Sequence, residues 1–430
     1  MCIRDQVHSM IEKQLVCNSI AEGFPDDLAA LTEGDLDAAP CLHRMDFTGD
    51  NVFTIDSETC RDMDDAVEVR RTAGGYRLAV HIADVAAYVQ PDSPLDSLAV
   101  NRATSFYLPD RTIPMLPAVL SNGLCSLNPG VRRNTLSVIM EIDKKGGVTD
   151  AWITKGVIRS RVKGIYAELN RILDGSAGDE LKYKYREVLD QLPVMTELYR
   201  ILHEGTVRRG VDTEDFDPPY VTVCDDDLVL APVAHGTAEE MVEEFMILAN
   251  ATVSRYLDDR GLPAIFRIQY SKEAMAEYQP FRVHHSSLGL ETYTHFTSPI
   301  RRICDTKIHQ ILGMHLDGCS DQEIHDRFDG TLPEVCERAT KRSRTARSVQ
   351  KKTVTDCCML FFQLHPGNRY TGRVVGRNRY KRPLLRIDGL NINVIGYETQ
   401  GADRIGEGFS FSVFASNSFA YANEIQPLAV

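Results

Sequence analysis

The densest cluster of reactive side chains is the acidic segment TIDSETCRDMDDAVEV at residues 54–69. Its positions 56–65 hold five carboxylates: Asp56, Glu58, Asp62, Asp64 and Asp65. Converging carboxylates repel one another, so they need raised pKa values or a positive partner. Oxygen donors suit Mg²⁺ or Mn²⁺, and such ions bind phosphate groups and activate water. We therefore expect a divalent-metal site with Asp56, Asp62, Asp64 and Asp65 as ligands.

The spacing of these aspartates predicts a loop rather than one regular strand. On a regular strand, Asp56, Asp62 and Asp64 would point to one face and Asp65 to the other. A loop that follows a strand lets all four side chains converge. For such a segment taken alone, an acidic and solvated loop without an ion is the alternative, and residues 225–227 are expected to form one.

Period-two alternation predicts sheet strands around this segment. Apolar residues alternate at 76–82 and again at 136–142, with turns at 74–75 and 144–147. Helical spacing returns beyond residue 157, where an apolar stripe is formed by Met241, Phe245, Leu248 and Val253. The middle of the chain is therefore expected to have an α+β fold.

The two ends of the chain differ from its middle. The first residues show helical spacing, and a last helical region is expected at 321–364. Five short strand-like runs then follow, separated by Gly and Asn, which is typical of a small all-β, OB-like barrel. We predict a helical lead-in at 1–45, a catalytic domain at 46–364 and the barrel at 365–430.

Composition excludes several classes of protein. A hydrophobic fraction of 43% and a charged fraction of 25% are ordinary for a globular chain. The chain lacks a long apolar run and its N-terminus is charged, so we expect a cytoplasmic rather than a membrane or secreted protein. Eleven cysteines without a C-x-x-C pair indicate neither a disulfide framework nor a structural zinc site. A net charge of -13 argues mildly against nucleic acid, but the last hundred residues are basic.

Six segments resemble the RNB-domain exoribonucleases, the ribonuclease II and ribonuclease R family. They are residues 54–69, GGYRLAVHIADVAAYV (74–89), residues 102–138, DFDPP (215–219), MVEEFMILAN (241–250) and YTHFTSPIRR (293–302). They occur in family order, which makes the resemblance specific. It implies an RNB-type catalytic domain that hydrolyses single-stranded RNA from the 3′ end, with Mg²⁺ or Mn²⁺, and releases nucleoside 5′-monophosphates.

The resemblance also implies catalytic roles. Asp56 and Asp65 match the family's metal-holding positions, and Asp62 assists them. Asp64 matches the aspartate on which cleavage depends most. Arg301 matches the arginine at the scissile phosphate, where a planar fork of donors stabilises developing negative charge. Asp64, Asp62 and Arg301 are thus the expected catalytic residues.

Further positions match RNA contacts of the family. Tyr107 matches the aromatic residue that packs on the terminal nucleotide, and stacking of this kind is indifferent to base identity. Tyr166 and Phe216 fall where further aromatic residues contact bases or ribose, with core packing as the alternative. Glu243 matches the acidic residue at the 3′-terminal nucleotide, although a helix-surface glutamate would look the same. Arg302 is expected to bind the RNA backbone or to serve the structure.

The barrel segment supplies a second set of expected RNA contacts. Its phosphate-binding candidates are Arg373, Arg377, Arg379 and Lys381. A solvated basic face is the alternative. Single-stranded RNA is therefore the expected partner, and an acidic body with a basic tail also suits docking to a larger RNA-processing assembly. We expect structural roles, not general-base roles, for His81 and His295, because both lie in strand-like or turn contexts.

Three departures from the family leave rival functions open. About 45 residues precede the nuclease segment, where the family usually has two cold-shock barrels, and the stretch between Arg267 and Tyr293 is short. The last helix is basic at TKRSRTARSVQKK, where the family has an acidic residue. One rival is therefore an RNB-derived RNA-binding or regulatory protein without turnover, and another is a metal-dependent phosphohydrolase of small esters. The four aspartates favour a nuclease, since a pure binder gains little from them.

Overall fold

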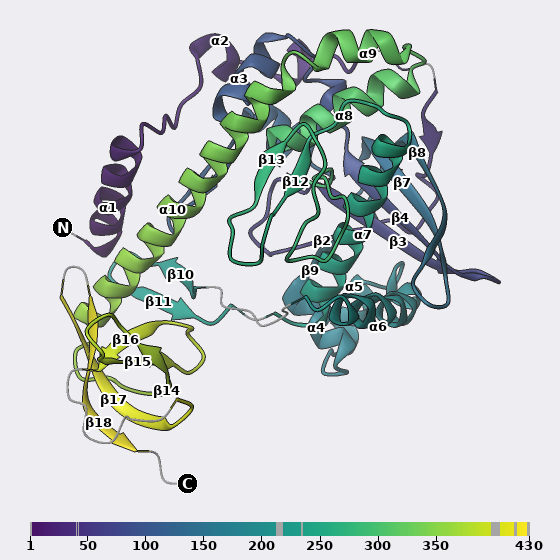
Figure 1. The fold of residues 1–430 in the computed structure, drawn as a ribbon. Coiled ribbons are helices and arrows are strands. Elements are labelled where there is room, and N and C mark those ends of the chain that lie inside the picture. Colours follow the sequence, from purple (N-terminus) through teal and green to yellow (C-terminus); the bar gives the residue numbers. More distant parts are fainter. Residues whose placement is uncertain are drawn as a thin grey trace.

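The computed structural model describes residues 2–39, 41, 43–211, 218–233, 235–396, 405–416 and 419–427. Helices and strands are mixed along the chain, so the predicted α+β class is confirmed. Figure 1 shows a sheet with helices against it, and a long helix that leads from there to a separate barrel. None of the helices in the described ranges is both long and apolar enough to cross a membrane.

A five-stranded sheet carries the centre of the fold. Its strand order is β1 (Met45–Asp46), β8 (Val148–Arg159), β7 (Arg132–Asp143), β4 (Gly75–Ala83) and β3 (Asp65–Arg71), and only the β1–β8 pair is parallel. The predicted alternation at 76–82 and 136–142 falls on β4 and β7, which pair with Leu78 opposite Met140. Gly75 begins β4 at a φ of 153°, and a Cβ there would meet the Ile142 carbonyl oxygen at 2.2 Å, so only glycine fits.

Helices cover this sheet and bury its apolar side chains. They are α6 (Leu192–Arg208), α7 (Thr237–Asp259) and α8 (Ile303–Leu316), and α4 (Tyr166–Leu173) packs against α7. In α7 the predicted apolar stripe is buried at Met241, Phe245 and Val253 and half-buried at Leu248. The stripe packs into one large cluster together with Leu78 of the sheet.

The last helical region consists of two helices rather than one. They are α9 (Asp321–Phe328) and α10 (Leu332–Leu364). In Figure 1, α10 crosses the molecule diagonally and ends at the barrel. The barrel is closed, in the order β14 (Arg369–Arg377), β15 (Pro383–Ile387), β16 (Asn393–Gly396), β18 (Ala420–Pro427) and β17 (Gly408–Ala415). The predicted small all-β barrel is therefore present.

The N-terminal helix α1 (Ile3–Cys17) lies beside α10 (Figure 1). Its apolar face packs into a second cluster, with Val349 of α10 and the barrel core. The rest of the lead-in is helical only at α2 (Asp26–Ala29) and in one turn at 33–35. The domain boundaries at residues 45 and 364 stay a prediction.

The remaining elements are short and connect the larger ones. They are β2 (Thr54–Asp56), α3 (Pro94–Arg102), β5 (Phe106–Tyr107), β6 (Thr112–Ile113), β9 (Lys163–Ile165), α5 (Asp179–Lys184), β10 (Tyr220–Val223), β11 (Leu228–Ala231), β12 (Phe266–Ile268) and β13 (Glu277–Gln279).

Candidate active site

Two strand ends and the loop between them carry the four aspartates. Asp56 is the last residue of β2, which pairs in parallel with β9, and Asp65 is the first residue of β3. Residues 57–64 between them form the predicted loop, from which Asp62 and Asp64 project. The backbone is secured here as well, because the amide of Ala83 in β4 donates to the Asp64 carbonyl at 2.8 Å.

Two side chains that the sequence analysis missed hold this loop in place. Lys163 Nζ donates to the carbonyl oxygens of Glu58 and Cys60, both at 2.7 Å. Ser126 Oγ donates to the carbonyl of Arg61 at 2.8 Å and accepts from the Met63 amide at 3.1 Å. Satisfied backbone groups keep an irregular loop ordered. Ser126 lies in a segment that resembles the family, whereas no sequence pattern pointed to Lys163.

Asp64 and Arg301 are brought together from distant parts of the chain. The Ile300 amide donates to Asp64 Oδ1 at 2.8 Å, and Arg301 Nε lies 3.3 Å from Asp64 Oδ2. Arg301 Nη2 also donates to Ser298 Oγ at 2.8 Å. The Arg301 carbonyl accepts from Thr104 Oγ1 and from the Ser105 amide, both at 3.1 Å. The guanidinium is thus held beside the aspartates before any ligand binds.

Burial disfavours the charged form of three of the aspartates and so raises their pKa values. It is the largest cause that raises the pKa of Asp56 to about 6 and that of Asp65 to about 8. Burial also raises the pKa of Asp64 well above its ordinary value, against the lowering effect of Arg301. Asp64 is only 3% exposed. A carboxylate removed from water without full compensation needs a proton or a cation.

Two buried carboxylate oxygens are suited to a cation. Asp56 Oδ2 and Asp64 Oδ2 accept no hydrogen bond from any residue of the described part. Their chemistry, hard anionic oxygen, matches Mg²⁺ or Mn²⁺. The four aspartates are not preassembled, however, since no three metal-binding side chains in the described residues are grouped to hold one ion. Mutual repulsion accounts for this, because carboxylates without an ion between them separate.

Asp62 points to an aromatic residue. The Tyr107 hydroxyl donates to Asp62 Oδ2 at 2.9 Å, and Tyr107 is 37% exposed. Tyr166 begins α4, and its pKa is raised mainly by burial and then by the charges of Asp65 and Asp56, so it lies close to them. Both predicted aromatic residues are therefore near the aspartates. Phe216 lies outside the described residues.

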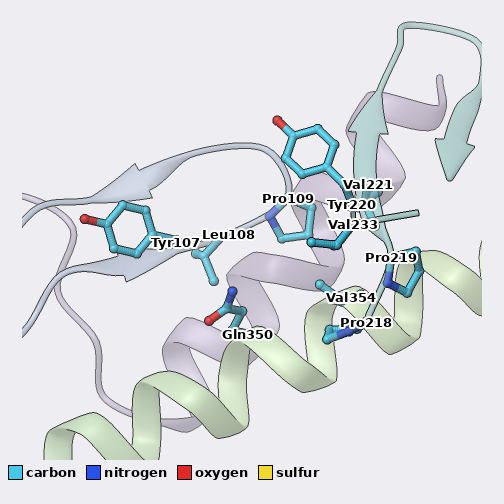
Figure 2. A pocket seen from close by; sticks show the side chains of 10 residues that line it. All are labelled: Tyr107, Leu108, Pro109, Pro218, Pro219, Tyr220, Val221, Val233, Gln350 and Val354. Carbon is cyan, nitrogen blue, oxygen red and sulfur yellow. The ribbon is translucent and has the colours of Figure 1, made fainter. Parts of the chain in front are cut away.

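A cavity of about 240 Å³ opens beside Tyr107. Figure 2 shows three sets of side chains around it: Tyr107, Leu108 and Pro109 next to β5; Pro218, Pro219, Tyr220, Val221 and Val233 around β10; and Gln350 and Val354 on α10. Its lining is largely apolar, with the exposed ring of Tyr220 at its edge. Tyr107 thus links this cavity to Asp62.

The other predicted site residues have different surroundings. Arg302 donates from Nε and Nη2 to Asp305 Oδ1, at 3.1 and 2.7 Å, and Asp305 is fully buried. This favours the structural role for Arg302. Glu243 lies on α7 and contributes, after burial, to the raised pKa of Tyr293, which is about 12.

The two histidines are held by structural contacts. His81 Nδ1 lies 2.8 Å from Ser137 Oγ, and burial lowers its pKa to about 3. His295 Nδ1 lies 2.8 Å from the Tyr278 hydroxyl, and burial lowers its pKa as well. Neutral, hydrogen-bonded imidazoles agree with the predicted structural roles.

The basic residues of the barrel are exposed. They are Arg373, Arg377, Arg379 and Lys381. Arg373 Nη2 lies 3.7 Å from Asp388 Oδ1, and the Arg379 guanidinium sits 4.8 Å from the ring centroid of Tyr380. Arg377 Nη1 donates to the Lys381 carbonyl at 2.9 Å. These four residues form a charged face that is separate from the aspartates.

Comparisons with known proteins show which sequences and folds this chain resembles. The sequence profile of the RNB domain matches residues 44–275 and 273–318. Ribonuclease R 1 of Lactococcus lactis is 30% identical over 473 residues, and ribonuclease R of Thermotoga maritima is 33% identical over 410 residues. These alignments cover 93% and 81% of this chain but 57% of each relative, so the chain spans little more than half their length.

Solved structures share the fold. RNase R of Mycoplasma genitalium, in its apo form, aligns with a TM-score of 0.81 at 22% identity, over 97% of this chain and 78% of that one. The same protein is also known in complex with single-stranded and double-stranded RNA. Yeast Ssd1, described as a pseudonuclease, aligns with a TM-score of 0.68 at 18% identity, over 94% of this chain and 56% of that one.

Proposed function

The chain belongs to the RNB domain family, and on this premise we propose that it is a metal-dependent 3′-to-5′ exoribonuclease. The proposed reaction hydrolyses single-stranded RNA to nucleoside 5′-monophosphates. The observation that carries the proposal is the ion pair of Asp64 with Arg301, beside buried carboxylate oxygens that lack hydrogen-bond partners in the described part. The relatives named ribonuclease R support it.

The aspartates would hold the divalent ion, Mg²⁺ or alternatively Mn²⁺. Asp56, Asp62, Asp64 and Asp65 are its proposed ligands. The fit rests on Asp56 Oδ2 and Asp64 Oδ2, two buried oxygens that accept no hydrogen bond in the described part, the second of which has the Arg301 guanidinium 3.3 Å away. When bound, such an ion neutralises phosphate charge and lowers the pKa of a coordinated water. Asp64 keeps its buried position through the Ile300 amide, which orients the carboxylate toward Arg301.

Arg301 would stabilise the charge that develops on the phosphoryl oxygens. Its guanidinium is oriented by Ser298 Oγ and Asp64 Oδ2, so little reorganisation accompanies the reaction. Planar guanidinium donors match two phosphate oxygens at once. Asp64, Asp62 and Arg301 are the proposed catalytic residues.

The RNA would approach along aromatic and basic side chains. Tyr107 is proposed to stack on the terminal base, because its ring is partly exposed between Asp62 and the apolar cavity. Tyr166, Phe216 and Glu243 are proposed as further RNA contacts, whereas Arg302 is proposed to serve the structure through its hydrogen bonds to Asp305. The barrel would bind backbone phosphates. A cytoplasmic location and docking to a larger RNA-processing assembly stay predictions.

A second candidate function is RNA binding without turnover. The basic window of α10 at residues 340–352, where the family has an acidic residue, favours this reading, and so does the likeness to the pseudonuclease Ssd1. The four aspartates favour the enzyme, because desolvated carboxylates lower stability and serve no purpose in a protein that only binds RNA.

The test is hydrolysis of a 5′-labelled single-stranded RNA in Mg²⁺ or Mn²⁺, with EDTA as a control. We expect a ladder that shortens from the 3′ end and releases 5′-monophosphates. Asp64→Asn should reduce the rate by at least about 10³-fold and leave RNA affinity nearly unchanged, because several kcal/mol of transition-state stabilisation are lost.

Asp226→Asn is the matched control, since Asp226 is exposed in the turn between β10 and β11. It removes the same charge and should leave the rate unchanged. If the wild-type protein binds the RNA but leaves it intact in both metals, the proposed nuclease activity is wrong and the RNA-binding candidate is favoured.

A further inference from the structure

A second cavity, of about 660 Å³, shares no lining residue with the cavity beside Tyr107. It is bounded by the end of α1, by α3 and by α10, three elements that are adjacent in Figure 1. Asn18 and Ser19 line it from the end of α1, Asn101 from α3, and Arg338, Lys341 and Arg342 from α10. The sequence analysis noted the basic run on α10 but assigned it no partner.

Three cations on one face of α10 meet in this cavity. Lys341 and Arg342 come three and four positions after Arg338, so each lies next to Arg338 on the helix surface. Arg338 has polar partners: Glu334 Oε1 at 2.9 Å and the side-chain oxygen of Asn101. No carboxylate in the described part of the chain pairs with Lys341 or Arg342.

Like charges are also crowded around Arg342. Arg342 is half-buried, and burial, followed by the charge of Arg338, lowers its pKa. Burial, followed by the charge of Arg342, likewise lowers the pKa of Arg102 at the end of α3. Half-buried cations that repel one another destabilise the fold unless an anion compensates them. Since Lys341 and Arg342 line the cavity and neither pairs with a carboxylate in the described part, an anion is the ligand that this part of the cavity fits.

Two carboxylates line the same cavity beside the cations. Glu334 and Glu337 line it one turn earlier on α10. Carboxylates accept hydrogen bonds from hydroxyl or amino groups, so a ligand with an anionic end and a hydroxylated end matches both halves. The volume lies within the range of about 300–1,000 Å³ that is usual for small-molecule sites.

The end of α1 contributes a strained backbone to the same cavity. Ser19 has a φ of 52°, in the left-handed region that side chains other than glycine rarely adopt. Such strain is often found where a ligand is bound. The adjacent Asn18 and the exposed hydroxyl of Ser19 supply neutral polar groups next to the cations.

We propose that this cavity binds the phosphate group of a nucleotide through Lys341 and Arg342, with Glu337 accepting hydrogen bonds from the sugar. Two sources share this chemistry, a free nucleoside 5′-monophosphate and a nucleotide unit of an RNA strand. The identity of the ligand as a nucleotide rests on the proposed function, because that reaction consumes the strand and releases the monophosphate. The charge arrangement that calls for a phosphate group does not depend on it.

The cavity is connected to the candidate active site through β5. The Arg342 guanidinium lies 5.8 Å from the ring centroid of Phe106, and the next residue, Tyr107, donates to Asp62. Neighbouring residues on a strand point to opposite sides, so a nucleotide at Arg342 and the aspartates would lie on the two sides of β5.

The test is direct binding of 5′-AMP and of a short single-stranded RNA, by calorimetry and fluorescence anisotropy, in EDTA so that no RNA is hydrolysed. Lys341→Ala should weaken binding of at least one of the two ligands by about tenfold or more, as expected for the loss of a charge-assisted hydrogen bond. Lys341 is exposed, so this variant should fold, which its thermal unfolding curve will verify.

Lys351→Ala is the matched control. Lys351 is exposed on the same helix, outside the cavity, and its removal changes the net charge equally. Weaker binding of 5′-AMP by Lys341→Ala alone supports the free monophosphate as the source, and weaker binding of RNA alone supports the strand. Equal affinity of the wild-type protein and Lys341→Ala for both ligands overturns the proposal, as does an equal loss in Lys351→Ala.

This outcome is separate from the fate of the proposed function. Hydrolysis of RNA in Mg²⁺ or Mn²⁺ tests the aspartates, whereas binding in EDTA tests the cavity. If the protein binds 5′-AMP at Lys341 but leaves RNA intact, the cavity proposal stands and the proposed nuclease function is wrong. If the protein hydrolyses RNA but its Lys341→Ala variant binds both ligands with wild-type affinity, only the cavity proposal is wrong.

Discussion

The aspartate loop and the C-terminal barrel each concentrate charge of one sign, but they place it in opposite environments. Asp56, Asp64 and Asp65 have pKa values raised mainly by burial. Arg373 and Arg379 on the barrel are exposed, and water and salt screen them. The buried aspartates therefore lower the stability of the fold but interact strongly with a bound cation. The exposed arginines of the barrel cost little stability, and each of them interacts only weakly with RNA.

The comparison shows why similar charge patterns in the sequence differ in meaning. A buried charge needs a specific partner in a defined position, so a single substitution changes chemistry. An exposed charge contributes to a field that several residues share, so the effect of one substitution is small. The predictions below test this difference, in order of decreasing effect.

Replacement of the partly exposed Arg301 guanidinium should have the largest effect of these three changes. Arg301→Lys keeps the charge but loses the planar donors that contact Asp64 and Ser298, so we expect kcat on RNA to fall by about 10²-fold with KM little changed. Arg347→Lys, at an exposed position of α10, is the control. A fall of less than about threefold would contradict the transition-state role of Arg301.

Neutralisation of the barrel face should have a moderate effect on binding only. For the triple variant Arg373→Ala, Arg379→Ala and Lys381→Ala, we expect weaker RNA affinity and a salt-dependence slope that is smaller by about 2, or about 0.7 for each lost phosphate contact. The kcat on very short oligomers should not change. Affinity measured from low to high salt checks this.

The control for the barrel variant removes three exposed lysines outside the barrel: Lys144, Lys145 and Lys182. It changes the net charge equally, so it separates a local contact from the overall field. Equal slopes for the two triple variants would mean that the barrel residues form only a solvated basic face.

Loss of one hydroxyl should have the smallest effect. Tyr107→Phe keeps the ring that is proposed to stack on RNA but removes the hydrogen bond to Asp62, so we expect kcat to fall by about three- to tenfold. Tyr220→Phe, which alters another hydroxyl at the same cavity, should not change kcat. If the two variants have equal rates, the hydroxyl does not position Asp62.

Local patterns in the sequence determined the elements. Alternation at 76–82 and 136–142 predicted strands that are present as β4 and β7, because side chains on a strand point alternately to its two faces. The apolar stripe through Met241 and Phe245 predicted α7. The acidic segment identified the candidate site, since carboxylates at that density need a cation wherever the fold places them.

Only the tertiary structure decided which groups meet. Asp64 and Ile300 are 236 positions apart, and neither periodicity nor spacing could pair them. The same holds for Lys163 and Ser126, which hold the loop through its backbone carbonyls, and for Arg102 and Arg342, whose charges repel each other. Burial raises the pKa values of the aspartates and lowers that of Arg342, and it arises only when the elements pack together. A linear pattern specifies which charges exist, and packing specifies which of them lose water and therefore need a partner.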